Sequence, residues 1–110
     1  MMGKPTIVCL CGSTRFGEAF RESQFYETLA GKIVLTIGCN MRSDDEIFSD
    51  LTEHKKAEIK KMLDELHLRK IDLADEVLIL NVGGYIGEST RNELEYAKAK
   101  GKKIRYLEGE

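Results

Sequence analysis

Short runs of apolar residues alternate along the chain with longer stretches in which apolar residues recur at helical spacing. The runs cover residues 7–11, 33–37, 77–82 and 104–107, and the longer stretches cover 17–30, 51–73 and 90–100. The runs have the length and composition of buried strands, and the stretches have the periodicity of helices. The pattern therefore predicts the element order βαβαβαβ.

The apolar residues of the first two helical stretches form a stripe in each, which we expect to face the sheet. In the first stretch the stripe consists of Phe20, Phe25, Leu29 and Ala30, and in the second of Ile59, Met62, Leu63, Leu66 and Leu73. Charged residues occupy the remaining positions of the second stretch, as expected for a solvated helix face.

The alternation of strands and helices predicts an α/β fold, with a parallel sheet joined by right-handed crossovers and helices on both faces. We expect a flavodoxin-like or Rossmann-like sheet with the strand order 2-1-3-4. In that order, strands one and three are neighbours whose chains leave in opposite directions, which opens a crevice at their carboxyl ends. Residues 12–15 and 83–93 follow these two strands, and they are the two stretches richest in glycine and hydroxyl side chains. The site is therefore expected there.

Length and charge narrow the class of protein. The 110 residues fit one domain, spanning 1–110, and the net charge is only −2, with basic and acidic residues interleaved. Without a uniform basic face, polymeric nucleic acid is not expected as a partner. No apolar run approaches the roughly 18 residues that would span a membrane. We therefore expect a cytoplasmic protein that does not enter a membrane.

The chain has three cysteines, and two of them, Cys9 and Cys11, stand two positions apart in the first strand. Residues at this spacing share one face of a strand, so both are expected to pack as small apolar side chains. Neither His54 nor His67 has a second histidine or a cysteine at ligand spacing in the sequence. We therefore predict no metal site and no cofactor.

The first candidate loop is Gly12-Ser13-Thr14-Arg15, which joins a buried strand to a helix. It combines a glycine, two hydroxyls, free backbone N–H groups and a guanidinium, which together suit a phosphate or a carboxylate. The alternative is a helix cap, because serine and threonine are favoured there without any ligand. Capping alone does not require Arg15.

The second candidate loop holds three glycines within five positions, at Gly83, Gly84 and Gly87. Glycine permits backbone conformations that other residues avoid, so the loop is suited to a close approach to a ligand. Substrate contacts are expected from Asn81, Gly83, Gly84 and Ser89.

Glu93 follows this loop and is the candidate nucleophile. We expect it in the first turn of the last helix, where the positive end of the helix dipole would keep its carboxylate ionised. The alternative is a capping box formed by Thr90 and Glu93, which would explain the glutamate without catalysis.

Three short motifs are similar to those of a known family. They are Cys11-Gly12-Ser13-x-Arg15 after the first strand, Ala74-Asp75 before the third, and Asn92-Glu93-Leu94-x-x-Ala97 after the second loop. The chain thereby resembles the nucleoside 2-deoxyribosyltransferase superfamily, and most closely its 2'-deoxynucleoside 5'-monophosphate N-glycosidase branch. The resemblance implies a nucleoside or nucleotide in the crevice and a glutamate, here Glu93, that attacks the anomeric carbon of the sugar. It also implies that Ser13 and Arg15 lie on the phosphate side.

The chain departs from this family at three positions. His67 stands where family members carry an aspartate that holds the sugar, and Glu95 stands where a glycine is usual. Cys9 or Leu10 stands where an aromatic residue is expected near the end of the first strand. His67 is expected either to replace the aspartate as a catalytic residue or to mark lost activity. The alternatives are a non-catalytic nucleotide-binding module on the same fold, and a lysine-decarboxylase-like phosphoribohydrolase, which the loop 83–93 loosely resembles. A homodimer is compatible with the resemblance, because some members complete the site from a second subunit.

Residues 38–50 are polar and irregular and follow the second strand. We expect this stretch to be a lid over the base and sugar, with Asn40 and Arg42 as substrate-binding residues. The alternative is a loose surface connection.

Overall fold

The sheet is parallel throughout and has four strands. The computed structural model describes residues 3–37 and 51–109, and in it β1 (Ile7–Cys11), β2 (Ile33–Leu35), β3 (Glu76–Ile79) and β4 (Lys103–Tyr106) pair in the order β2-β1-β3-β4. Cys9 lies opposite Leu35 on one side and Val77 on the other. The predicted α/β fold and strand order are therefore confirmed.

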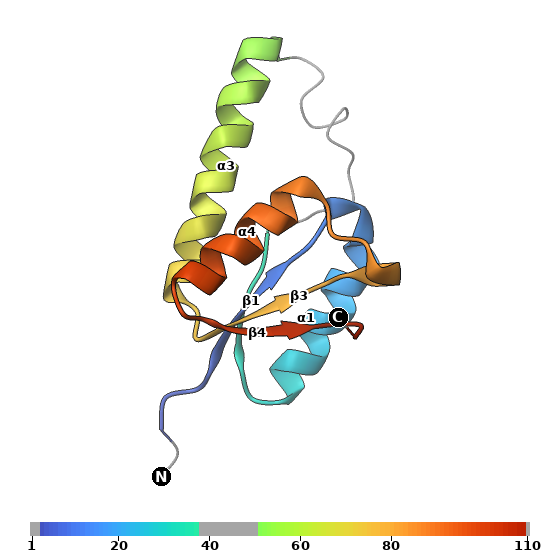
Figure 1. Ribbon diagram of the computed structural model, residues 1–110, viewed down its shortest axis with the longest axis vertical. Coiled ribbons are helices and arrows are strands. Elements are labelled where there is room, and N and C mark those ends of the chain that lie inside the picture. Colours follow the sequence, from blue (N-terminus) through green and yellow to red (C-terminus); the bar gives the residue numbers. More distant parts are fainter. Residues whose placement is uncertain (1–2, 38–50, 110) are drawn as a thin grey trace.

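Helices cover both faces of this sheet (Figure 1). The helix α1 (Gly17–Leu29) packs on one face, and α3 (Glu53–Leu73) and α4 (Glu88–Ala99) lie together on the other. Two short 3-10 turns, η1 (Thr14–Phe16) and η2 (Val82–Gly84), follow β1 and β3. None of the described helices combines the length and the apolar character needed to cross a bilayer.

The pleat of the strands divides the core into two clusters. Val8, Leu10 and Leu78 face α1 and pack around Phe20. The alternate positions face α3 and α4, and the buried residues of that cluster are Cys9, Cys11, Ile71, Ala74, Val77, Ile79, Leu94 and Ala97. Cys9 and Cys11 thus share one face of β1, as predicted, and both are fully buried.

The buried faces of α1 and α3 differ from the predicted stripes. In α3 the buried residues are His67 and Ile71, whereas Met62, Leu63, Leu66 and Leu73 are exposed. In α1 Phe20 is buried as predicted, but Phe25 and Leu29 are exposed. Figure 1 shows a reason for Met62 and Leu63: α3 is longer than the sheet that it covers, and its N-terminal half extends beyond the sheet.

Four charged residues pair near the amino ends of β3 and β4, and we call them the charged cluster. They are Glu27, Lys32, Glu76 and Arg105. Glu76 accepts hydrogen bonds from Lys32 Nζ and Arg105 Nη2, each at 2.8 Å, and Glu27 pairs with the same two cations. The cluster links α1 to the strands that it covers.

Candidate functional site

The loops after β1 and β3 lie against each other where the two strands end. The Leu80 amide donates to the Cys11 carbonyl oxygen at 2.8 Å, which extends the pairing of the strands to the edge of the sheet. Gly12 packs so closely on Leu80 that an added Cβ would lie 3.0 Å from the Leu80 Cβ. Because the chain turns to opposite sides after β1 and β3, this edge is the crevice of the fold.

Tyr85 joins the two loops. The guanidinium of Arg15 lies 4.5 Å from the centre of the Tyr85 ring, and Phe16 meets the same ring edge-on at 5.9 Å between centroids. Ser13 Oγ accepts a hydrogen bond from the Arg15 amide at 3.3 Å, so Ser13 caps η1. The capping alternative therefore accounts for Ser13, whereas Arg15 is exposed on a tyrosine face beside the crevice.

Asn81 and Gly83 hold the C-terminal segment. The Asn81 side chain accepts from the Glu108 amide at 2.9 Å and donates to the Glu108 carbonyl at 3.0 Å, and the Gly83 amide donates to Glu108 Oε2 at 3.1 Å. Asn81 is buried and its amide is engaged with the backbone, so its role in this structure is to fix a segment of the chain. Gly83 and Gly84 have φ angles of 65° and 83°, which explains the glycines.

The beginning of α4 corrects the interpretation of Glu93. Gly87 is the N-cap without a side-chain hydrogen bond, Ser89 lies exposed in the first turn, and Thr90 is buried. The capping box of Thr90 and Glu93 is therefore wrong. Glu93 also lies beyond the first turn of α4, where the effect of the helix dipole has largely faded. The prediction that the dipole keeps the Glu93 carboxylate ionised is therefore wrong.

Glu93 instead faces three side chains that we call the cysteine–histidine cluster, namely Cys9, Cys11 and His67. His67 Nε2 lies 3.3 Å from Cys11 Sγ and 3.7 Å from Cys9 Sγ, and Glu93 Oε1 lies 3.9 Å from the same nitrogen. The three cluster residues are 0 to 4% exposed, and the Glu93 side chain is 13% exposed. Two thiols from β1 and a carboxylate from α4 thus converge on one imidazole nitrogen, which α3 carries.

No family model, curated protein or solved structure matches this chain.

Contacts within this group shift the protonation of its members. The hydrogen bond with Cys11, opposed by burial and supported by His67, lowers the pKa of the Cys9 thiol to about 6. The same hydrogen bond, together with burial, raises the pKa of the Cys11 thiol well above its ordinary value. The two thiols therefore titrate as a coupled pair, in which Cys9 ionises more readily than Cys11.

Burial acts in opposite directions on the pKa values of Glu93 and His67. It raises the pKa of the Glu93 carboxyl above 4.5, although the neighbouring His67 partly offsets this effect. Burial alone would lower the pKa of His67, but the hydrogen bond and charge of Cys9, with the charge of Glu93, raise it. Among residues 3–37 and 51–109, nothing hydrogen-bonds to the buried Nδ1 atom of His67, and the polar contacts of the ring there are made through Nε2.

The sequence analysis did not predict this arrangement. The expectation of no metal site rested on the lack of neighbouring ligands for His67, yet the packing of α3 on β1 brings Cys9 and Cys11 to it across more than fifty residues. His67 lies inside α3, which continues for six residues beyond it. The available signal was Cys-x-Cys in a buried strand, combined with a histidine that shares a helix face with Ile71.

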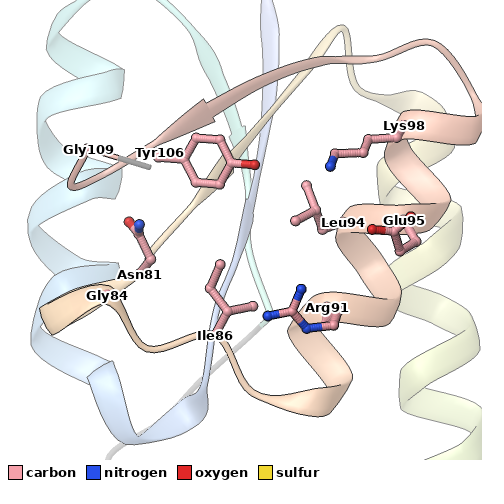
Figure 2. A pocket seen from close by; sticks show the side chains of 9 residues that line it. All are labelled: Asn81, Gly84, Ile86, Arg91, Leu94, Glu95, Lys98, Tyr106 and Gly109. Atoms are coloured by element: carbon pink, nitrogen blue, oxygen red, sulfur yellow. The ribbon is translucent and has the colours of Figure 1, made fainter.

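A separate hollow of about 280 Å³ lies on the other side of α4 (Figure 2). It is lined by Asn81, Gly84, Ile86, Arg91, Leu94, Glu95, Lys98, Tyr106 and Gly109. Arg91 and Lys98 bring two positive charges to it, and Tyr106 brings an aromatic ring. The hollow is lined by neither Glu93 nor His67, so it and the cysteine–histidine cluster are different places on this molecule.

Asn40 and Arg42, and the whole predicted lid at 38–50, lie outside the described residues. Gly12, Ser13, Thr14 and Arg15 lie together at the end of β1, as the predicted site requires.

Proposed function

We propose that the protein is a nucleotide N-glycosidase or deoxyribosyl transferase that cleaves the bond between base and sugar, with Glu93 as nucleophile. The observation that supports this most is the position of the Glu93 carboxylate. It lies beside His67 at the carboxyl end of β1, is largely shielded from water, and keeps 13% of its side chain accessible. A shielded carboxylate with a raised pKa is a stronger nucleophile than one in water.

The proposed reaction has two steps, by the logic of a retaining glycosidase. A Glu93 oxygen forms a bond to the anomeric carbon, while the carbon–nitrogen bond breaks and its electron pair leaves with the base. Water, or the nitrogen of a second base, then attacks the same carbon and releases the carboxylate. With water, the hydroxyl goes to the sugar and the remaining proton to the departed base, so that one water is added across the bond.

His67 and Arg15 have distinct roles in this proposal. The imidazole Nε2, at 3.9 Å from Glu93 Oε1, orients the carboxylate and balances its charge when protonated. Arg15 carries an exposed guanidinium on Tyr85 beside the crevice, and Ser13 adds a hydroxyl, so both suit the phosphate of a 5'-monophosphate. The substrate is thus a small nucleoside or nucleotide, and the predicted homodimer stays a prediction.

The decisive experiment incubates the chelator-treated protein with a panel of nucleosides, deoxynucleosides and their 5'-monophosphates. Free base is separated by chromatography, and intact-mass spectrometry searches for a glycosyl adduct on the peptide that carries Glu93. Release of base with an adduct on that peptide supports the proposal. A protein that binds a nucleotide yet releases no base from any member of the panel is not a glycosidase.

A non-catalytic nucleotide-binding module is the second candidate, and the hollow of Figure 2 favours it. Arg91 and Lys98 could pair with a phosphate there, and Tyr106 could contact a base, away from Glu93. Under this alternative, Arg91→Ala weakens nucleotide binding, while Glu93→Gln leaves it unchanged. If the protein is instead a glycosidase with Glu93 as nucleophile, Glu93→Gln abolishes the release of base and Arg91→Ala leaves it unchanged.

A further inference from the structure

The cysteine–histidine cluster has the composition of a metal site. Two cysteine sulfurs and one histidine nitrogen, all buried, offer ligand atoms that lie within 4.8 Å of one another. Sulfur and imidazole nitrogen are the ligands that zinc uses most in proteins, whereas Mg²⁺ and Ca²⁺ require oxygen. The third group facing His67 Nε2 is the carboxylate of Glu93, which zinc also accepts as a ligand.

The distances from His67 Nε2 to the two sulfurs fit a tetrahedral ion. Zinc binds sulfur at about 2.3 Å and histidine nitrogen at about 2.0 to 2.1 Å, so these two ligand atoms lie about 3.6 Å apart in a tetrahedral site. The observed distances from His67 Nε2 are 3.3 Å to Cys11 Sγ and 3.7 Å to Cys9 Sγ. An oxygen ligand would lie about 3.3 Å from the same nitrogen by the same geometry. A small rotation of Glu93, now at 3.9 Å, provides that contact.

We propose that the cysteine–histidine cluster binds one zinc ion per chain, with the carboxylate of Glu93 as the fourth ligand. Both thiols bind as thiolates, so their protons pass to solvent when the ion enters. The ligands come from β1, α3 and α4, and the ion therefore ties both helices of this face to the central strand. Access is past Glu93, the only one of the four side chains with more than a trace of exposure.

This inference does not depend on the proposed function, but it has a consequence for it. A carboxylate that is bound to zinc donates its lone pair to the ion and is not free to attack a sugar carbon. Bound zinc and release of base are therefore antagonistic in this protein. Metal binding is measured without nucleotide, and base release is measured after chelation, so the failure of one idea leaves the other intact.

The test uses Co²⁺ as a spectroscopic probe and Zn²⁺ as its competitor. Reduced, chelator-treated protein is titrated with Co²⁺ in the absence of oxygen, and absorption is followed. We expect one equivalent to produce a thiolate-to-cobalt charge-transfer band and the strong d–d bands of a tetrahedral ion, and Zn²⁺ to displace it. The midpoint of thermal unfolding should rise with the concentration of free Zn²⁺, because the ion binds the folded chain.

Four variants locate the site. Cys9→Ser and Cys11→Ser should each weaken Zn²⁺ binding by about a hundredfold or more, since even second-sphere partners of a metal are worth about 10- to 100-fold. Cys39→Ser, at the cysteine that lies outside the described residues, and His54→Gln, at an exposed histidine of α3, are the controls and should leave both the spectrum and the affinity unchanged. Circular dichroism verifies the fold of each variant.

If Cys9→Ser or Cys11→Ser prevents folding, the titration of the wild-type protein decides whether the cluster binds zinc. Folded wild-type protein that shows no charge-transfer band with Co²⁺ overturns the proposal. So does a band that disappears in Cys39→Ser or His54→Gln, because it would place the ion elsewhere. Glu93→Gln should keep the charge-transfer band, since both thiolates remain, but bind more weakly; an unchanged affinity would remove Glu93 from the ligand set.

Discussion

Two groups of polar side chains lie on opposite faces of the same sheet, and they differ in how their charges are matched. In the charged cluster two carboxylates meet two cations, and the contacts of Glu76 are at 2.8 Å. In the cysteine–histidine cluster two thiols, an imidazole and a nearby carboxylate meet at 3.3 to 3.9 Å without a permanent cation. The charges of the first group balance, whereas the second group has electron-pair donors in excess.

This difference separates a structural group from a reactive one. Burial of charge is costly unless each charge has a partner, so the charged cluster is explained by the packing of α1 on the sheet. No such explanation covers Cys9, Cys11, His67 and Glu93, whose pKa values are shifted by one another. Groups with mutually perturbed pKa values at the crevice of an α/β sheet are typical of functional sites.

The largest effect is expected from Glu93→Gln, which should reduce base release by about a thousandfold or more, because it removes the nucleophile. The midpoint of thermal unfolding should change little, because glutamine has nearly the same size. Chromatographic assay of free base measures the first quantity and calorimetry the second. Glu88→Gln is the matched control on the exposed side of α4, and equal turnover by both variants would remove Glu93 from the mechanism.

Glu76→Gln should have the reverse signature. It leaves Lys32 and Arg105 with one carboxylate between them, and we expect a loss of about 2 kcal/mol in the free energy of unfolding. Base release per folded molecule should be unaltered. Glu53→Gln is the control, because its pair with Lys56 is exposed and worth much less. Denaturant titrations of both variants give the comparison; equal stability would mean that the charged cluster is not structural.

The lowered pKa of Glu76 predicts that the stability of the fold depends on pH. Burial acts to raise the pKa of Glu76, but hydrogen bonds from Lys32 and Arg105 outweigh it and lower the pKa below 4.5. A group whose pKa is lower in the folded state stabilises the fold above its unfolded pKa, and this contribution is lost as the pH falls through the folded value. Unfolding of the wild type should therefore become easier below about pH 4.5, and Glu76→Gln should flatten that slope. Titrations at pH 7 and pH 3.5 test it.

The sequence predicted the fold well, because its signals were local and strong. The apolar runs that became β1 and β3 are buried on both faces, and such runs are typical of central parallel strands. The helix faces were harder. A stripe such as Met62, Leu63 and Leu66 indicates an apolar surface, but not what covers it, and here α3 extends beyond the sheet.

The candidate site was predicted only in part, for a related reason. The loops after β1 and β3 follow from topology, so their meeting at Tyr85 could be expected in outline. The cysteine–histidine cluster could not, because it depends on which turn of α3 reaches β1. Asn81 has a structural role that depends on Glu108, a contact between segments that no local pattern encodes.

Arg15→Ala should have a smaller effect, on binding alone. Arg105 pairs with two carboxylates, whereas Arg15 has no ion pair among the described residues and lies exposed on Tyr85. We expect affinity for a 5'-monophosphate to fall about 10- to 100-fold, and affinity for the matching nucleoside to remain, since a charged hydrogen bond is worth about 1.5 to 3 kcal/mol. Calorimetric titration with both ligands measures this. The control is Arg69→Ala, which removes an arginine that lies over the Tyr96 ring and should change neither affinity. If Arg15→Ala weakens the binding of nucleoside and nucleotide equally, Arg15 does not bind the phosphate.

The smallest effects are expected from two glycines on either side of η1. An alanine Cβ at Gly12 would lie 3.0 Å from the Leu80 Cβ and 3.3 Å from its carbonyl oxygen, so the end of β1 would have to shift, at about 1 to 2 kcal/mol of stability. Gly17 has helical backbone angles and nothing within 4 Å of an added Cβ, so Gly17→Ala should stabilise the fold by about 0.4 to 1 kcal/mol. Opposite shifts of the unfolding midpoint would establish that Gly12 is required by close packing. If both variants are stabilised, the loop has room at Gly12 and its glycine needs another explanation.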